Sequence, residues 1–221
     1  DVERLLRAAP AELSTPSRTV TGLVGGTSLI VDEITGQVRQ DLRTGEAIAL
    51  PVALAVMVLV FGGFLAAAMP MLGALVSIAA GLGSVHALSY VIEMDASVVN
   101  VVTVLGLGLS IDYGLLVVSR FREEMRDLLD GAPLGEDSRA LVVEATGRTV
   151  DRAGRTVVFS AVTVAIALSG LLFFPSVFMR AAGAAGVSVV VLCLVVATTL
   201  IPALCAMSAQ RLLRGRTDRA P

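Results

Sequence analysis

The stretch 100–119 constrains the fold most, because it is apolar, long enough to cross a bilayer, and carries one carboxylate, Asp112. A helix of about 20 apolar residues spans the ~30 Å hydrocarbon core of a membrane. An ionisable side chain at that depth costs roughly 3 kcal/mol or more, so it is retained mainly where it faces a protein interior or water. Asp112 is therefore predicted to be functional. The alternative is a structural carboxylate that accepts hydrogen bonds from a neighbouring helix.

Composition identifies the protein class. Hydrophobic residues make up 55% of the 221 residues and charged residues only 16%, with a mean hydropathy of +0.83. An ordinary soluble domain has about 25% charged residues. We expect an all-α polytopic membrane bundle of about five transmembrane helices, with a short α/β remnant of an extramembrane domain. The five apolar runs are 47–68, 70–92, 98–119, 156–174 and 179–207.

Residues 1–46 have the composition of a soluble segment. The alternation from Arg18 to Val24 predicts a short strand, and apolar residues at helical spacing predict a helix from Ser28 that leads into the membrane. One strand and one helix cannot close a hydrophobic core. We therefore expect the end of an extracytoplasmic domain whose remainder precedes Asp1, and an internal fragment of a longer protein.

The loop 120–155 is also patterned. Its apolar residues Phe121, Met125, Leu128 and Leu129 predict that the third span continues as an amphipathic helix, with the neighbouring charged residues on its other side, until Gly131 and Pro133 stop it. Ser138 is a candidate N-cap for a second helix that ends at about Thr149. We expect this pair of helices to lie along the membrane surface.

The arginines predict the orientation. Short connections at Met69-Pro70, 93–97 and 175–178 make consecutive spans antiparallel neighbours. The Arg-rich loop 120–155 and tail 208–221 then lie on one side, and Arg-rich flanks mark the cytoplasm. The domain sequence is expected to be extracytoplasmic segment 1–46, transmembrane helices 47–119, cytoplasmic loop 120–155, transmembrane helices 156–207 and cytoplasmic tail 208–221.

Three further residues are candidate neighbours of Asp112. Ser160 and Thr163 recur at helical spacing in the run 156–174 and can offer hydroxyls to the carboxylate. His86 is the single histidine, and an unperturbed imidazole titrates near pH 6.5. A neutral histidine hydrogen-bonded within the bundle is an equally good interpretation, as are simple packing stripes for the hydroxyl residues.

The surroundings of Asp112 suit proton binding. A carboxylate removed from water favours its protonated form more than it does in solution. Moving one charge through the membrane potential is worth about 2.3 kcal/mol per 100 mV, enough to bias a helix bundle between two conformations. Glycines flank the site and favour local bending of the helix. They are Gly106, Gly108 and Gly114.

Several function classes have no support in the sequence. The chain contains no Lys and no Gly-rich phosphate loop, which argues against ATP hydrolysis. Cys193 and Cys205 lie roughly 18 Å apart on one predicted helix, beyond the ~7 Å limit for a disulfide. We expect no catalytic residues, no enzyme activity, no metal, no cofactor and no nucleic-acid partner.

Three strings carry a family resemblance: GLGLSIDYG at 106–114, SRFREE at 119–124 and AGRTVVFSA at 153–161. Together they resemble the MmpL family of the resistance-nodulation-division (RND) transporters, in the family's order from about residue 20 to 207. The resemblance implies the last piece of an extracytoplasmic porter domain followed by transmembrane helices two to six. The first helix, most of the porter domain and the second half are missing. The loop between Met125 and Glu144 is longer than the family pattern.

The resemblance also implies a function. Asp112 and Tyr113 match the family's proton relay, which lies at the centre of the bundle where two halves meet. The relay drives export of lipids or other hydrophobic molecules across the bacterial cell membrane by the proton-motive force. The implied partners are protons, membrane lipids, a hydrophobic or lipid substrate, and a second half of the transporter or a second copy of this chain.

Two other classes remain as alternatives. A sterol-sensing-like or scaffolding membrane bundle has the same five-helix arrangement and gives Asp112 no proton role. A protein-translocation accessory of the same superfamily is also proton-driven, and differs in the porter domain. The SRFREE string favours an MmpL transporter over both.

Overall fold

The computed structural model describes residues 27–61, 64–94, 97–129 and 138–209. The chain divides into two units, Asp1–Ala53 and Leu54–Pro221. The strand expected at Arg18–Val24 lies outside the described residues. Every regular element in the described part is helical, which confirms the all-α class.

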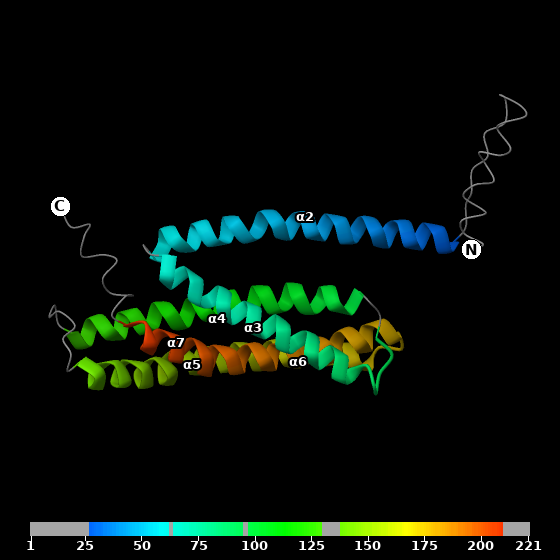
Figure 1. Cartoon of the computed structure of the whole chain (residues 1–221). Helices are drawn as coiled ribbons and strands as arrows, with labels where there is room; N and C mark the ends of the chain where they lie inside the picture. The colour runs from blue at the N-terminus through cyan, green and yellow to red at the C-terminus, as the bar shows by residue number, and fades with distance from the viewer. Residues whose placement is uncertain (1–26, 62–63, 95–96, 130–137, 210–221) are drawn as a thin grey trace, which may run out of the picture. The chain divides into compact units, whose positions relative to one another are not determined.

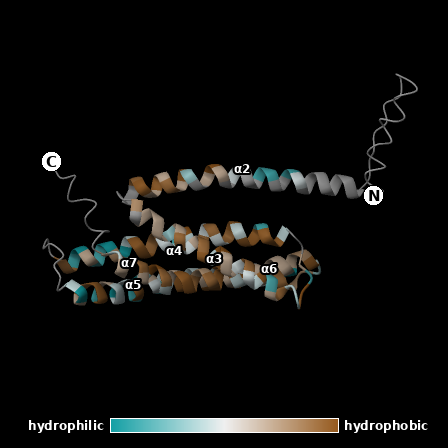
Figure 2. Ribbon diagram, viewed as in Figure 1, coloured by the Kyte–Doolittle hydropathy of each residue, from teal (hydrophilic) through white to brown (hydrophobic). Residues whose placement is uncertain are grey.

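In the second unit, four helical segments run alongside one another (Figure 1). They are α3 (Phe64–Leu88), α4 (Ser97–Leu129), α5 (Arg139–Ser169) with the 3-10 turn η2 (Gly170–Phe173), and α6 (Val177–Val195) continued by η3 (Val196–Leu200) and α7 (Ile201–Met207). Hydrophobic residues make up most of their length, while hydrophilic residues are concentrated near the ends (Figure 2).

Four described segments are long and apolar enough to cross a membrane: Ala66–Leu88, Ser97–Leu129, Arg139–Phe173 and Val177–Met207. They correspond to the last four predicted spans. The first predicted span, 47–68, corresponds to a shorter apolar stretch, Ala47–Leu59, within α2 (Thr27–Phe61). A fifth crossing therefore stays a prediction, whereas the helix expected from Ser28 is confirmed.

The break expected at Met69-Pro70 is wrong. α2 ends at Phe61 and α3 begins at Phe64, so Pro70 lies inside α3. A proline is tolerated within a membrane helix where neighbouring helices compensate for the lost hydrogen bond. Pro70 has such a neighbour: a Cβ placed on Gly114 of α4 would lie 2.8 Å from the Pro70 Cβ. Packing against α4 therefore covers the proline.

The third span continues as predicted, because α4 runs without interruption to Leu129. The separate surface helix from Ser138 to Thr149 is wrong, because α5 continues from Arg139 through the membrane-length stretch to Ser169, and Ser138 makes no side-chain cap hydrogen bond. One buried stripe explains the continuity. Ala145, Thr149, Ala153 and Val157 recur every four residues and are all 4% exposed or less, so both parts present the same face to the bundle.

The last span contains a π turn at Val196–Leu200, directly before Pro202. Proline lacks the N–H that would continue the helical ladder. Threonine hydroxyls compensate locally: Thr198 donates to the Leu194 carbonyl at 2.8 Å and Thr199 to the Val195 carbonyl at 2.5 Å. The span thus continues through α7 despite the proline.

Candidate functional site

Asp112 lies on α4, and its side chain is exposed at the surface of the described bundle. Among the described residues, none donates a hydrogen bond to its carboxylate. The neighbouring positions on the same face, Gly108, Leu115 and Leu116, are exposed as well. This face therefore combines a carboxylate with apolar surface, and the hydrogen bond to a neighbouring helix considered as an alternative is not made within the described part.

Tyr113 has the opposite environment, because it is only 5% exposed. Its hydroxyl crosses to α5 and donates to the Ser160 Oγ over a long 3.5 Å. Successive residues of a helix point about 100° apart, which places Asp112 outside and Tyr113 inside the same turn. The two adjacent side chains therefore differ: Asp112 is exposed, whereas the Tyr113 hydroxyl makes a partly buried contact with the next helix.

The other predicted neighbours differ in their placement. Ser160 reaches Tyr113, as described above, and not the Asp112 carboxylate. Thr163 is exposed and donates to the Phe159 carbonyl of its own helix at 2.8 Å. It is therefore not brought to the site.

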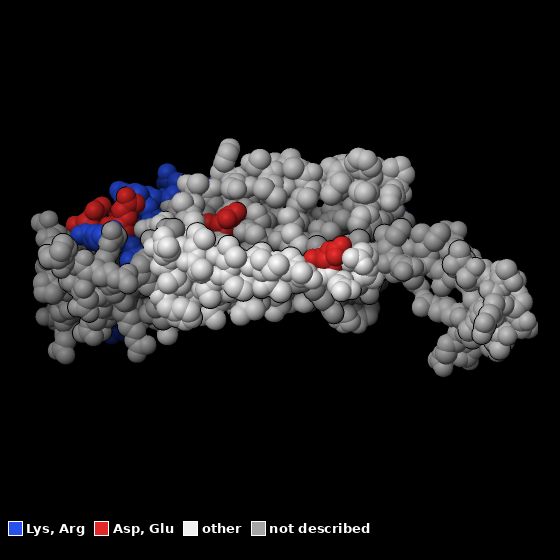
Figure 3. Space-filling model, turned by 90° about the horizontal axis from the view of Figure 1, so that it is seen from above, with Lys and Arg blue, Asp and Glu red and all other residues white. Residues whose placement is uncertain are grey.

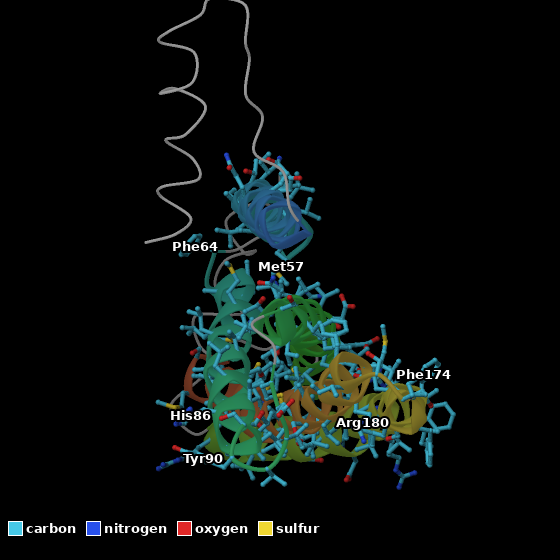
Figure 4. The ribbon with its side chains drawn as sticks, turned by 90° about the vertical axis from the view of Figure 1, so that its right-hand side faces the viewer. Met57, Phe64, His86, Tyr90, Phe174 and Arg180 are labelled. Carbon is cyan, nitrogen blue, oxygen red and sulfur yellow. The ribbon has the colours of Figure 1, made fainter. Side chains whose placement is uncertain are left out.

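His86 lies far from Asp112. Gly106 packs against Ile78 and Gly114 against Pro70, and in this antiparallel register Asp112 is level with residue 72 of α3. His86 is 14 residues further along, about 21 Å away. Its ring instead contacts Tyr90, with Nε2 3.3 Å from the phenolic oxygen and the two rings edge to face. Figure 4 shows the two residues near each other.

The three flanking glycines have two kinds of environment. A Cβ on Gly106 would lie 3.2 Å from the Ile78 side chain, and one on Gly114 would lie 3.0 Å from the Ile201 Cδ1. Both positions are close helix contacts. Gly108 has no described neighbour within 4 Å of such a Cβ, so of the three it is the one free of packing constraints. The bending proposed for these glycines stays a prediction.

A small polar cluster inside the bundle escapes the sequence analysis. Ser110 of α4 is 1% exposed and donates to the Cys193 Sγ of α6 at 3.3 Å. Ser77 of α3 is fully buried and lies beside the same Cys193 thiol. Small residues recur every three or four positions in α3, which indicates that Ser77 faces another helix, although the spacing alone does not identify that helix. They are Gly73, Ser77, Gly81 and Ser84.

A second overlooked cluster involves Glu124, which is 1% exposed although it was expected on the polar side of α4. Its Oε1 pairs with the Arg120 Nε at 3.1 Å and with Arg152 of α5 at 2.5 Å. Glu124 follows Phe121 by three positions and precedes Leu128 by four, so helical spacing does place it within the apolar stripe. Arg122, 7% exposed, was also misplaced.

Charged side chains are concentrated at this end of the bundle (Figure 3). Besides the Glu124 pairs, Arg120 contacts Glu123 at 2.5 Å and Arg148 contacts Glu144 at 2.6 Å. Both of these pairs are within one helix and partly exposed, so each stabilises little. The Glu124–Arg152 pair differs in two ways. Its carboxylate partner, Glu124, is buried, and the pair joins two helices.

The model of the MMPL family matches residues 1–220 of the chain. The chain belongs to the MMPL family. Together with its four membrane-length apolar helices, this makes it a multi-pass membrane protein, as the composition predicts.

This chain matches only part of the length of its MMPL relatives. A protein of Streptomyces coelicolor described as a membrane protein is 43% identical, over 82% of this chain and 24% of the relative. The trehalose monomycolate exporter MmpL3 of Mycobacterium tuberculosis is 37% identical, over 81% of this chain and 18% of the exporter. The mycolic acid-containing lipids exporter MmpL11 of Mycolicibacterium smegmatis is 27% identical, over 76% and 16%. The matched part is at most a quarter of each relative.

Proposed function

We propose that this chain forms the transmembrane part of one half of an MMPL transporter of the RND superfamily. This transporter uses the proton-motive force to export lipids or other hydrophobic molecules across the bacterial cytoplasmic membrane. Asp112 and Tyr113 are its proton relay. The substrate class is proposed from the relatives, two of which are named as exporters of mycolic acid derivatives.

One observation carries the relay assignment: the Asp112 carboxylate is on a membrane-length helix, on an exposed face without a partner among the described residues. Left against lipid, such a group costs several kcal/mol. A face of this kind therefore needs water or another protein surface. A second transporter half, or a second copy of this chain, would supply that surface.

Tyr113 gives the relay a connection to the rest of the bundle. A change in the charge of Asp112 alters the field at the adjacent peptide and phenol, and the phenol contacts Ser160 on α5. The relay residues are thus Asp112 and Tyr113, with Ser160 as the contact on α5. The positions of Thr163 and His86 do not support relay roles for them.

Substitution of Asp112 by Asn tests this function. The amide keeps the shape of the side chain but cannot titrate, so proton-driven export of trehalose monomycolate by energised vesicles containing the intact transporter should fall to background. Asp127→Asn is the matched control, because Asp127 is an exposed carboxylate on the same helix beyond the apolar stretch. Wild-type export by Asp112→Asn at normal abundance would refute the relay.

A further inference from the structure

The strongest feature outside the relay is the Glu124 cluster, which joins α4 to α5 at their charged ends. The carboxylate is 1% exposed, and its Oε1 pairs with Arg152 across the interface and with Arg120 on its own helix. Its Oε2 is buried and receives no hydrogen bond from a described residue. A carboxylate removed from water in this way depends on its arginines, because an unpaired buried charge is strongly unfavourable.

The pair joins the same two helices as the Tyr113–Ser160 contact. From Tyr113 to Glu124 is about 16 Å along α4, and from Ser160 to Arg152 is about 12 Å along α5. The long arginine side chain covers the difference between the two spacings. Two polar contacts, at different positions along the helices, therefore join α4 to α5.

Large side chains contribute little to this interface. The buried face of α5 consists mainly of small residues, which let the two backbones approach closely. The apolar stretch of α5 is also the least covered of the four, with 11% of it buried against 39% for that of α4. Its buried positions are Ala145, Thr149, Ala153, Gly154, Val157 and Ala161.

We propose that Glu124, through its ion pair with Arg152, is a positioning residue that fixes the register of α4 against α5 and so holds the Tyr113 hydroxyl at Ser160. Specifying register is the best-attested role of buried polar groups in helix bundles. This inference rests on the proposed function, because its consequence for transport depends on Tyr113 acting in the relay.

A double-mutant cycle tests the inference in the intact transporter, with transport measured per inserted molecule. Tyr113→Phe removes one hydrogen bond and should slow transport about fivefold. If Glu124 acts through Tyr113, Glu124→Gln should cause a loss of similar size, and the double variant should be no slower than the slower single variant. Independent effects would instead multiply to about 25-fold, and would overturn the proposal.

Two arginine variants separate positioning from a general loss of charge. Arg152→Gln should reproduce the Glu124→Gln loss, whereas Arg152→Lys, which keeps the charge, should recover most of the transport. Arg148→Gln is the matched control, because Arg148 pairs with Glu144 on its own helix and crosses no interface. It should leave transport unchanged.

The outcomes also separate this inference from the proposed function. Wild-type transport by Glu124→Gln, or a loss as large in Arg148→Gln as in Arg152→Gln, would overturn the positioning role and leave the relay intact. Wild-type transport by Asp112→Asn would refute the relay itself. Transport is measured per inserted molecule, which corrects for any reduced abundance of Glu124→Gln. Arg152→Gln repeats the test at a side chain that is half exposed and therefore easier to substitute without disturbing the fold.

Discussion

Asp112 and Tyr113 are adjacent in the sequence, yet one side chain is exposed and the other is buried against α5. This difference predicts different roles for the two. In the proposed relay, the carboxylate is the proton-binding group, while the phenol donates a hydrogen bond to Ser160. Glu124, further along the same helix, is paired with two arginines, Arg120 and Arg152.

Tyr113→Phe should therefore impair transport less than Asp112→Asn. Removing the hydroxyl loses one hydrogen bond, worth roughly 1 kcal/mol, and leaves the acid in place. The initial rate of proton-driven export measures the effect. Tyr90→Phe is the control, because Tyr90 contacts His86 away from the site and should leave the rate unchanged. A Tyr113→Phe transporter with no activity would show that the hydroxyl is an obligatory proton carrier.

The helix contacts around the site depend on glycine. Gly114 lets α4 approach Pro70 of α3 and Ile201 of α7, whereas a Cβ added to Gly108, on the exposed face beside Asp112, would meet no described residue within 4 Å. Two glycines less than two turns apart therefore differ in their surroundings: Gly114 permits close packing, and bending of the helix at Gly108 stays a prediction.

Alanine substitution should distinguish these two positions. Gly114→Ala places a Cβ 2.8 Å from the Pro70 Cβ, and overpacking of this kind costs about 1–3 kcal/mol. Gly108→Ala should instead stabilise the helix by roughly 0.5–1 kcal/mol. Thermal unfolding in detergent, followed by circular dichroism, measures both. Equal effects of the two substitutions would contradict the packing role of Gly114.

Hydropathy and helical spacing predict much of this architecture, including the four confirmed spans and the extension of α4 to Leu129. They miss features that depend on the facing helix. Pro70 does not end a helix because α4 covers it, and Thr149 does not end one because its buried stripe continues. Asp112 and Tyr113 could be predicted because they are neighbours in the sequence. The Tyr113–Ser160 and Glu124–Arg152 contacts could not, because they depend on how α4 is aligned with α5, and no local sequence pattern specifies that alignment.

At the scale of the whole molecule, the arginine distribution predicts orientation. The end of the bundle with Arg120 and Arg152 should be cytoplasmic, and the end with Tyr90 extracytoplasmic. In a Cys193→Ala, Cys205→Ala background, a membrane-impermeant thiol reagent added outside should label Tyr90→Cys but not Ala140→Cys. Both positions are exposed. Permeabilisation should make Ala140→Cys reactive, and the reverse pattern would overturn the orientation.

The exposed Asp112 face predicts how the 221-residue chain behaves by itself. It should either self-associate through this face or keep Asp112 protonated, because an ionised carboxylate against lipid is unfavourable. Ser119→Cys, on the same face, should form cross-linked dimers in mild detergent, or a protonated-carboxyl infrared band should persist at mildly alkaline pH. A monomer with an ionised Asp112 at neutral pH would contradict both expectations.

Coupled proton movement tests the central claim most directly. Liposomes containing the intact transporter and an internal pH indicator would report proton flux when a lipid substrate is added. The wild type should show substrate-dependent proton flux, Asp112→Glu should retain part of it because it keeps a titratable group, and Asp112→Asn should show none. Substrate-dependent proton flux of wild-type size in Asp112→Asn would contradict the account.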